Sequence, residues 1–301
     1  MRILVTGTSG HIGGAVVNLL CQEGHEVIGI SRTVNPALPE AVRQYSLDIT
    51  DPEFIDKALD SLGDCEVIVH AAASMKDDTH IQELLEVNYT GSLKLLDVAD
   101  SLQTRCFIYL SSLSILGMPC EHPITEAHPL TPRTGYAVSK LTGEHEVIEG
   151  GTDVLRTISL RISSPVGPGL RHRRICRLFV ERALENAPLQ IHGTGARRQD
   201  YVDVRDIAQG ILQAVCSDCR GIYNLGSGVP ASNLELAQRC IQTLRSSSEI
   251  VMTGENDPDD QVCWDLSIAK AARDFGYRPR FTLEQSIADL AAEIQGLRPG
   301  T

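Results

Sequence analysis

Three side chains in the middle of the chain have the chemistry of proton transfer. Tyr136 and Lys140 are four residues apart and therefore share one face of a predicted helix. A free phenol titrates at about pH 10, and a neighbouring ammonium favours its ionised form, so Lys140 would make Tyr136 a usable acid or base. Upstream, an apolar strand from Phe107 ends in Ser111-Ser112, and the Ser112 hydroxyl could hydrogen-bond the same substrate oxygen. This set predicts conversion between a secondary alcohol and a ketone, with hydride moving at a nicotinamide ring.

A glycine-rich turn at the start of the chain predicts a dinucleotide site. Strand Ile3 to Val5 runs into a GxxGxxG pattern, and an apolar-periodic helix follows directly. Gly7 permits the tight turn, Gly10 lets backbone approach a pyrophosphate, and Gly13 lets the helix pack closely on the strand. The helix N-terminus then offers free N–H groups to the anion. The expected contacts from this segment are Gly7, Ser9, Gly10, His11, Ile12 and Gly13.

The end of the second strand bears on which dinucleotide is bound. NAD-binding proteins usually place an acid there, and this chain has Ser31 followed by Arg32. A hydroxyl and a guanidinium suit a 2′-phosphate, so the pair predicts a preference for NADP over NAD; the alternative is a solvated arginine. Asp48-Ile49, after another short strand, are placed to meet the adenine, although Asp48 is equally typical of a turn.

Short apolar runs alternate with helical patterns along the chain. The strands and helices that this alternation predicts would position the proton-transfer and dinucleotide-binding residues. The predicted strands are Ile3 to Thr6, Glu26 to Ile30, Val67 to Ala71, Phe107 to Ser111 and Thr157 to Ile162, with a helix from Ile12 to Glu23. Such alternation predicts an α/β, Rossmann-type, doubly wound parallel sheet.

A turn-rich break from Ser163 to Gly169 predicts a smaller α/β C-terminal substrate lobe, beginning with a basic helical stretch from Arg171 to Glu185. A helix from Phe281 to Ile294 should close the fold. The predicted nucleotide domain comprises residues 1–164 with about 202–228, and the predicted lobe comprises 165–201 and 229–301.

Composition excludes several classes of protein. The 301 residues carry a formal charge of -12, which argues against nucleic-acid binding. No run approaches the roughly 20 apolar residues of a membrane span, and the N-terminus enters a strand without a signal-peptide pattern. Nine irregularly spaced cysteines indicate reduced thiols in a cytoplasm, and the Cys216-x-x-Cys219 pair alone is a weak metal signal, so no metal site is predicted.

The motifs taken together resemble the extended short-chain dehydrogenase/reductases, in particular the NAD-dependent epimerase/dehydratase family that acts mainly on nucleotide sugars. The resemblance extends over almost the whole chain. Besides the glycine turn it is carried by Asp48, His70-Ala71-Ala72-Ala73, Asn88, Ser111-Ser112, Tyr136 with Lys140, Arg161, Gly167-Pro168-Gly169, Gly193-Thr194-Gly195, Asp200 to Asp206, Tyr223 to Gly228 and Gly276 to Pro279.

This resemblance implies roles for further residues. It implies Ser112, Tyr136 and Lys140 as catalytic residues and a homodimer built from helices of the nucleotide domain. It also implies cofactor contacts from Ala71, Ala72, Ala73, Tyr136, Lys140 and Ile162, and substrate contacts from Ser74, Ser112, Leu113, Ser164 and Gln199.

Several positions depart from the family pattern. Dehydratases place an Asp-Glu pair where Leu113 and Ser114 stand, and neither residue can act as a general acid or base, so a sugar dehydratase is not expected. Epimerases usually have Asn at Ser164, Arg at Gln199 and a second Arg in the loop now occupied by residues 255–257; those arginines clamp a pyrophosphate. Arg197, Arg198 and the run from Arg171 to Arg174 could substitute, although that run is more typical of a solvated helix face.

Three hypotheses follow. The first is an NADP-preferring oxidoreductase that interconverts a secondary alcohol and a ketone on a sugar, nucleotide sugar or related small metabolite; the departures from the family pattern favour a substrate smaller or less polar than a nucleotide sugar. The second is a redox-neutral nucleotide-sugar epimerase with tightly bound NAD. The third is a nonenzymatic dinucleotide sensor, against which the retention of Ser112, Tyr136 and Lys140 argues.

Overall fold

The computed structural model describes residues 1–297, and its centre is a sheet of seven parallel strands in the order β10-β6-β5-β4-β1-β2-β3. The order reverses at β1, which is the arrangement of a doubly wound dinucleotide-binding sheet. The middle strands β1, β4 and β5 are almost wholly buried because helices cover both faces, which explains their unbroken apolar sequence. The predicted fold class is confirmed.

Each predicted strand of the central sheet, and the predicted helix from Ile12 to Glu23, agrees with the observed element to within one or two residues at either end. The strands are β1 Arg2–Thr6, β2 Glu26–Ser31, β3 Arg43–Ser46, β4 Val67–His70, β5 Cys106–Ser112, β6 Arg156–Ile162 and β10 Gly221–Leu225. The helices are α1 His11–Gln22, α2 Phe54–Leu62, α3 Ile81–Leu85, α4 Gly91–Ser101, α5 Gly135–Glu149, α7 Val204–Val215 and α9 Ala269–Phe275.

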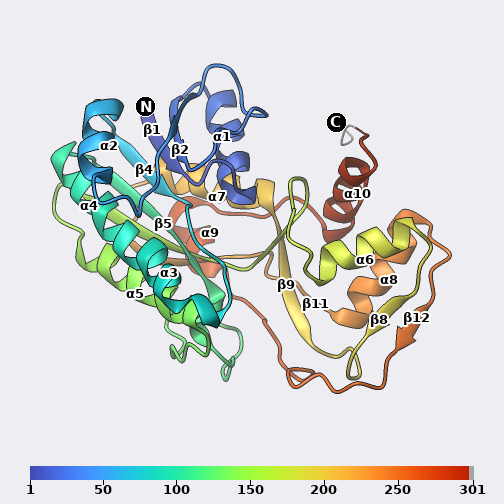
Figure 1. The fold of residues 1–301 in the computed structure, drawn as a ribbon. Helices are drawn as coiled ribbons and strands as arrows, with labels where there is room; N and C mark the ends of the chain where they lie inside the picture. The colour runs from blue at the N-terminus through green and yellow to red at the C-terminus, as the bar shows by residue number, and fades with distance from the viewer. Residues whose placement is uncertain (298–301) are drawn as a thin grey trace.

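Two apolar cores lie on opposite faces of the sheet. One core joins strand side chains to α1 and α7, for example Val17 and Ile211, and the other joins them to α2, α4 and α5, for example Ala58, Leu95 and Val147. Figure 1 shows the two layers, with α2, α4 and α5 on one side of the strands and α1 with α7 on the other. The carboxyl ends of the strands therefore open between the two helix layers.

A second group of elements lies beside this sheet (Figure 1). It contains β7 Ser164–Val166, β8 Leu189–Ile191, β9 Arg198–Asp203, β11 Pro230–Ser232 and β12 Ile250–Met252, with helices α6 Ile175–Leu184, α8 Asn233–Leu244 and α10 Leu283–Ile294. The strands form one three-stranded sheet, β11-β9-β7, and one two-stranded sheet, β12-β8. The three helices pack together around a core of their own that includes Phe179, Leu236 and Leu290.

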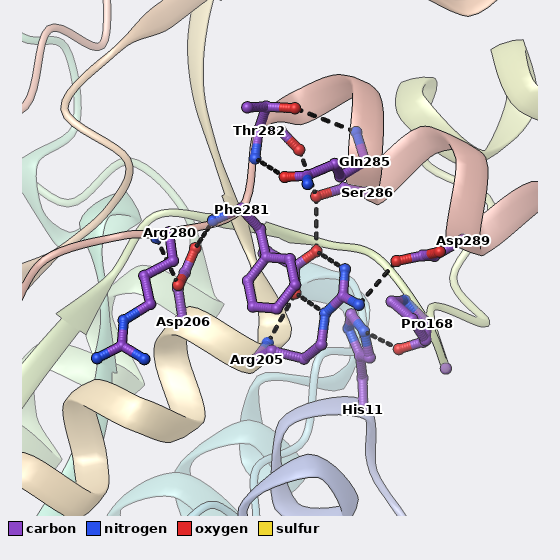
Figure 2. Close-up of polar contacts among 12 residues, drawn as sticks. His11, Pro168, Arg205, Asp206, Arg280, Phe281, Thr282, Gln285, Ser286 and Asp289 are labelled. Atoms are coloured by element: carbon purple, nitrogen blue, oxygen red, sulfur yellow. Dashed lines mark hydrogen bonds and ion pairs between the residues drawn. The ribbon is translucent and has the colours of Figure 1, made fainter. Parts of the chain in front are cut away.

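A polar cluster connects the N-terminus of α7 to α10 and is shown in Figure 2. Arg205 binds both oxygens of Asp203 at 2.8 Å, pairs with Asp289 at 2.7 Å and stacks on the Phe281 ring. Ser286 donates to Asp203 at 2.6 Å. Because Asp203 and Arg205 stand at the end of β9 and the start of α7, this cluster fixes the two groups of elements against each other.

The basic segment before α6 differs from the expectation. A helix was predicted from Arg171, but α6 begins at Ile175, and Arg174 is its N-cap residue with extended backbone. The Arg174 N–H donates to the His172 carbonyl at 2.8 Å, so the arginines of this segment lie in a loop and not on a helix face. Within residues 1–297, no helix is both long and apolar enough to cross a bilayer.

Candidate active site

The predicted proton-transfer set converges at the carboxyl end of β5. Ser112 is the last residue of β5, and its Oγ accepts a hydrogen bond from the Ser114 N–H at 3.2 Å. Thr134 caps α5 through the Ala137 N–H, which places Tyr136 in the first turn of that helix. The Ser112 side chain interacts with the Tyr136 phenol and partly opposes the rise in its pKa that burial causes. Two hydroxyls from separate segments thus face one location where a substrate oxygen could bind.

Lys140 lies one turn after Tyr136 and is buried, with a relative exposure of 2%. Its Nζ lies 3.9 Å from the centroid of the Tyr109 ring on β5. Burial lowers the pKa of Lys140 to about 7, while the negative charge of Glu144 acts in the opposite direction. The ammonium is therefore close to losing its proton at neutral pH, unlike an ordinary surface lysine.

The pKa of Tyr136 is shifted in the opposite direction from the one expected from the sequence. We expected Lys140 to depress it, but burial of the phenol by the surrounding protein raises it. Besides Ser112, the opposing influence is the positive charge of Arg174, from the loop before α6. Within the protein, the effect of burial on the phenol therefore outweighs these opposing influences.

A directional chain of hydrogen bonds underlies the site. The Ala72 N–H donates to Thr6 Oγ1 at 3.2 Å, Thr6 Oγ1 lies 2.7 Å from His70 Nδ1, and His70 Nε2 lies 3.0 Å from Ser92 Oγ. Ser92 in turn donates to the Asn88 carbonyl at 2.8 Å. Since Ser92 uses its proton there, His70 must donate through Nε2 and accept at Nδ1.

The same chain of hydrogen bonds continues through Asn88 to α5, the helix that carries Tyr136 and Lys140. Asn88 lies in a π-helical turn, Glu86–Thr90, of the kind often found at functional sites. Its side-chain amide accepts from the Ser74 N–H at 2.7 Å and donates to Ser139 Oγ at 2.9 Å. Ser139 donates to the Tyr136 carbonyl at 2.8 Å. Burial lowers the pKa of His70 to about 3, so the chain carries no charge at neutral pH.

The glycine turn has the form that a pyrophosphate requires. Gly7 has a positive φ of 72°, and a Cβ at Gly13 would lie 2.2 Å from the Gly7 carbonyl oxygen, so no larger residue fits there. Gly10 is the N-cap of α1, whose first turn has neither a capping side chain nor an acidic residue. The N–H groups of this turn can therefore bind an anion. Ser9, Gly10 and His11 also line a cavity of about 600 Å³.

Two further predicted contacts of the glycine turn, His11 and Ile12, interact with other parts of the protein. His11 Nε2 donates to the Pro168 carbonyl at 2.9 Å, which ties the glycine turn to the Gly167-Pro168-Gly169 loop (Figure 2). Burial lowers the pKa of His11 to about 4, so its imidazole is neutral. Ile12 packs partly buried against the core between the sheet and α1.

The residues that bear on dinucleotide choice differ in whether their polar groups are already hydrogen-bonded within the protein. The Ser31 hydroxyl donates to the Thr33 carbonyl at 2.6 Å, so its proton is not available to a phosphate oxygen. Arg32 is exposed on the loop after β2. Asp48 accepts from the N–H and hydroxyl of Thr50, which is a turn-forming arrangement, and Ile49 is buried.

The residues implied by the resemblance lie at the ends of strands. Ala71, Ala72 and Ala73 follow β4, and Ile162 ends β6 opposite Ser112 in the register. Leu113 is buried in a small apolar cluster beside the site, and Ser74 is held by Asn88. Ser164 begins β7, and Gln199 lies on β9 opposite Ala231.

The two arginines that precede Gln199 in the chain both form ion pairs with carboxylates. Arg197 Nη1 lies 3.6 Å from Asp259 and 4.0 Å from Asp257, both in the acidic loop before α9. Arg198 pairs with Glu235 at 3.3 Å and donates to the Pro230 carbonyl. Both expected substitutes for a pyrophosphate clamp are therefore already partly neutralised by carboxylates.

Sequence reasoning missed several residues that hold the site together. Thr6, Ser92 and Tyr109 were not singled out, Ser114 was noted only as a replacement for a dehydratase acid, and Glu144 was not connected with Lys140. Only Glu144 carried a usable signal, because it follows Lys140 by four residues on the same predicted helix. The others depend on contacts across strands and helices that no local pattern reveals.

The fold and site together define a dinucleotide-dependent α/β enzyme, and comparison with known proteins identifies its family. Residues 3–226 match the model of the NAD dependent epimerase/dehydratase family. The chain therefore belongs to this family, within the extended short-chain dehydrogenase/reductases.

Individual relatives match along nearly the full chain. The low-salt glycan biosynthesis protein Agl12 of Haloferax volcanii is 26% identical, over 95% of this chain and 96% of the relative. A dTDP-glucose 4,6-dehydratase of Actinoplanes sp. is 27% identical over 97% of each chain. The structure of a Thermus thermophilus UDP-glucose 4-epimerase in complex with NAD has a TM-score of 0.86 and 25% identity, with 98% of this chain and 99% of that chain covered.

Proposed function

We propose that this enzyme interconverts a secondary alcohol and a ketone on a sugar or related small metabolite, with Tyr136 as the acid/base. The observation that carries the proposal is the convergence of the Ser112 and Tyr136 hydroxyls at the end of β5, with Lys140 one helical turn further. When bound, the nicotinamide ring of the dinucleotide accepts or supplies the hydride. Its pyrophosphate would be held by the N–H groups of the Gly7 to Gly13 turn.

The side chains divide the proton chemistry between them. In the oxidation direction, Tyr136 Oη takes the proton of the substrate hydroxyl, while Ser112 Oγ hydrogen-bonds the same oxygen and fixes its orientation. In the reduction direction, Oη returns the proton to the ketone oxygen. Lys140 in its cationic form favours the phenolate and so eases both directions.

The charges of the substrate end favour a ligand without a diphosphate. Arg197 is paired with Asp257 and Asp259, and Arg198 with Glu235. A diphosphate would have to compete with these carboxylates for both guanidinium groups. Leu113 in place of an acid also argues against the dehydratase reaction of some relatives. The second candidate remains a redox-neutral epimerase acting on a nucleotide sugar, which the similarity to epimerase structures favours.

Cofactor choice, assembly and location form part of the same proposal. The NADP preference now depends on Arg32 alone, since the proton of Ser31 is used within the protein, and the dinucleotide in related structures is NAD. We propose two domains with the boundaries given above, residues 298–301 lying outside the described part. A homodimer formed by helices of the nucleotide domain and a cytoplasmic location, suggested by nine free cysteines, complete the proposal.

The deciding experiment uses purified full-length enzyme. Denaturation followed by mass spectrometry of the released nucleotide distinguishes the two candidates, because one NAD per chain is expected of an epimerase and little or none of a reductase. The enzyme is then mixed with simple ketones, sugar ketones and nucleotide ketosugars, and NADPH and NADH oxidation is followed by absorbance. Consumption with a non-nucleotide ketone supports the proposal, and none with any ketone contradicts it.

A further inference from the structure

Tyr109 lies directly behind the catalytic lysine. It is on β5, three residues before Ser112, and its side chain is completely buried on the sheet face covered by α4 and α5. Its ring face is 3.9 Å from Lys140 Nζ, and its hydroxyl donates to the carbonyls of Lys140 at 3.3 Å and Asn88 at 3.4 Å. One side chain thus contacts both the amine and the backbone of the catalytic lysine.

We propose that Tyr109 is a positioning residue for the reaction, whose ring face holds the Lys140 ammonium in its charged form beside Tyr136. The proposal rests on the proposed function, since it assigns Tyr109 a role in the chemistry of that site. A cation over the face of an aromatic ring is attracted by the negative charge density of the ring, and most strongly where water is excluded. Lys140 and Tyr109 are both excluded from water.

The other groups that face Lys140 make such support necessary. From β4, His70 is neutral and offers no negative charge, and from its own helix Glu144 is shared with Arg161 at 2.7 Å and with Ser159 at 2.8 Å. Tyr136, in the preceding turn, is a neutral phenol until it ionises. Burial, only partly offset by Glu144, brings the pKa of Lys140 down to about 7, so any further loss of stabilisation of the charged form would deprotonate it.

The hydroxyl and the ring of Tyr109 have separable roles. The hydroxyl links α5 to the π-helical turn, and α5 packs so closely against it that a Cβ at Gly143 would lie 2.5 Å from the phenol oxygen. The ring alone contacts the ammonium. Burial raises the pKa of Tyr109 well above its usual range, so the hydroxyl stays a neutral donor.

A second lysine provides an internal control. Lys270 Nζ lies 4.3 Å from the centroid of the Tyr223 ring, but it also donates to the Ile222 carbonyl at 2.7 Å and is partly exposed. The chain contains five lysines, so the signals of [13C]lysine-labelled protein can be resolved and titrated one by one. The Lys140 signal is identified by its absence from Lys140→Met.

The test compares three side chains at position 109 in the full chain, all in the same dinucleotide state. Tyr109→Phe removes the hydroxyl, and a ring-fluorinated phenylalanine keeps the shape but withdraws the negative charge from the ring face. We expect the Lys140 midpoint to stay in place in Tyr109→Phe and to fall by about one pH unit with the fluorinated ring, while Lys270 does not move. Circular dichroism and urea unfolding verify that each variant is folded.

Two results would overturn the proposal: an unchanged Lys140 midpoint with the fluorinated ring, or an equal fall in Tyr109→Phe, which would assign the effect to the hydroxyl. In the activity assay, the basic limb of the pH profile should shift in the same direction as the midpoint. Absence of all hydride transfer in the unaltered chain would contradict the proposed function, whereas the midpoints would still decide whether the ring holds the charge.

Discussion

The charged groups around Lys140 and those around Gln199 are held in opposite ways. Around Lys140, the Arg161–Glu144 pair is 2% exposed on each side, and its partners are fixed by the central sheet. Around Gln199, Arg197 is 36% and Asp259 37% exposed, and they pair with one another across a loop. Burying charge costs free energy, whereas exposed pairs contribute little. The costly buried pair thus lies beside the proposed proton-transfer residues, and the exposed pair lies beside Gln199, a proposed substrate contact.

The largest effect on activity should come from a substitution in the buried region around Lys140. Tyr136→Phe removes the proton carrier without changing the shape of the first turn of α5, and we expect kcat/KM to fall by about 10²-fold or more. The measurement is the rate of NAD(P)H oxidation with the preferred ketone, and the control is Tyr89→Phe on the neighbouring π-helical turn. Activity retained in Tyr136→Phe would remove the acid/base assignment, whereas loss of activity with an intact cellular role would favour the sensor hypothesis.

The next effect concerns stability. Glu144→Gln leaves Arg161 as an unpaired buried charge, and we expect the free energy of unfolding to fall by about 3 kcal/mol. Because Glu144 also raises the pKa of Lys140, the Lys140 midpoint should fall further below 7. Glu146→Gln, two residues away with a 37% exposed side chain, serves as the control and should leave the urea midpoint almost unchanged. Equal stability of the two variants would show that the buried pair contributes no more than an exposed one.

The same contrast explains what the sequence could reveal. The Gly7 to Gly13 turn, the strands and the Tyr136–Lys140 pair were predictable because each depends on short spacings: a period, a turn residue, or two positions four apart. Their convergence with Ser112 was an expectation based on the order of the motifs along the chain and on the family resemblance. The family resemblance then added Ala71 to Ala73 and Ile162.

The remainder depends on contacts between distant segments. No local pattern indicates that Thr6 and Ser92 flank His70, or that Tyr109 lies behind Lys140. The lowered pKa of Lys140 likewise arises from tertiary burial, which also keeps the Tyr136 phenol protonated. Even the basic run was misplaced, because its spacing resembles a helix while its backbone is extended at Arg174.

The smallest effect should come from substitutions in the exposed region around Gln199, where Arg197 pairs with two carboxylates. Asp257→Asn with Asp259→Asn frees Arg197 without altering side-chain size, and we expect the affinity for UDP to rise about fivefold, in line with the modest strength of exposed ion pairs. The measurement is calorimetric titration of UDP into the full-length protein. Glu284→Gln, which frees Arg239 from a pair of similar exposure on α8 and α10, should leave UDP binding unchanged.

Tight binding of UDP to the unaltered chain would reverse the conclusion drawn from these charges. It would mean that Arg197 exchanges its carboxylates for a diphosphate, as exposed pairs with small net energies can do. The epimerase hypothesis would then become the better one, while the assignments of Tyr136 and Lys140 would stand. Weak binding that strengthens only when the carboxylates are removed would instead show that the acidic loop excludes diphosphates.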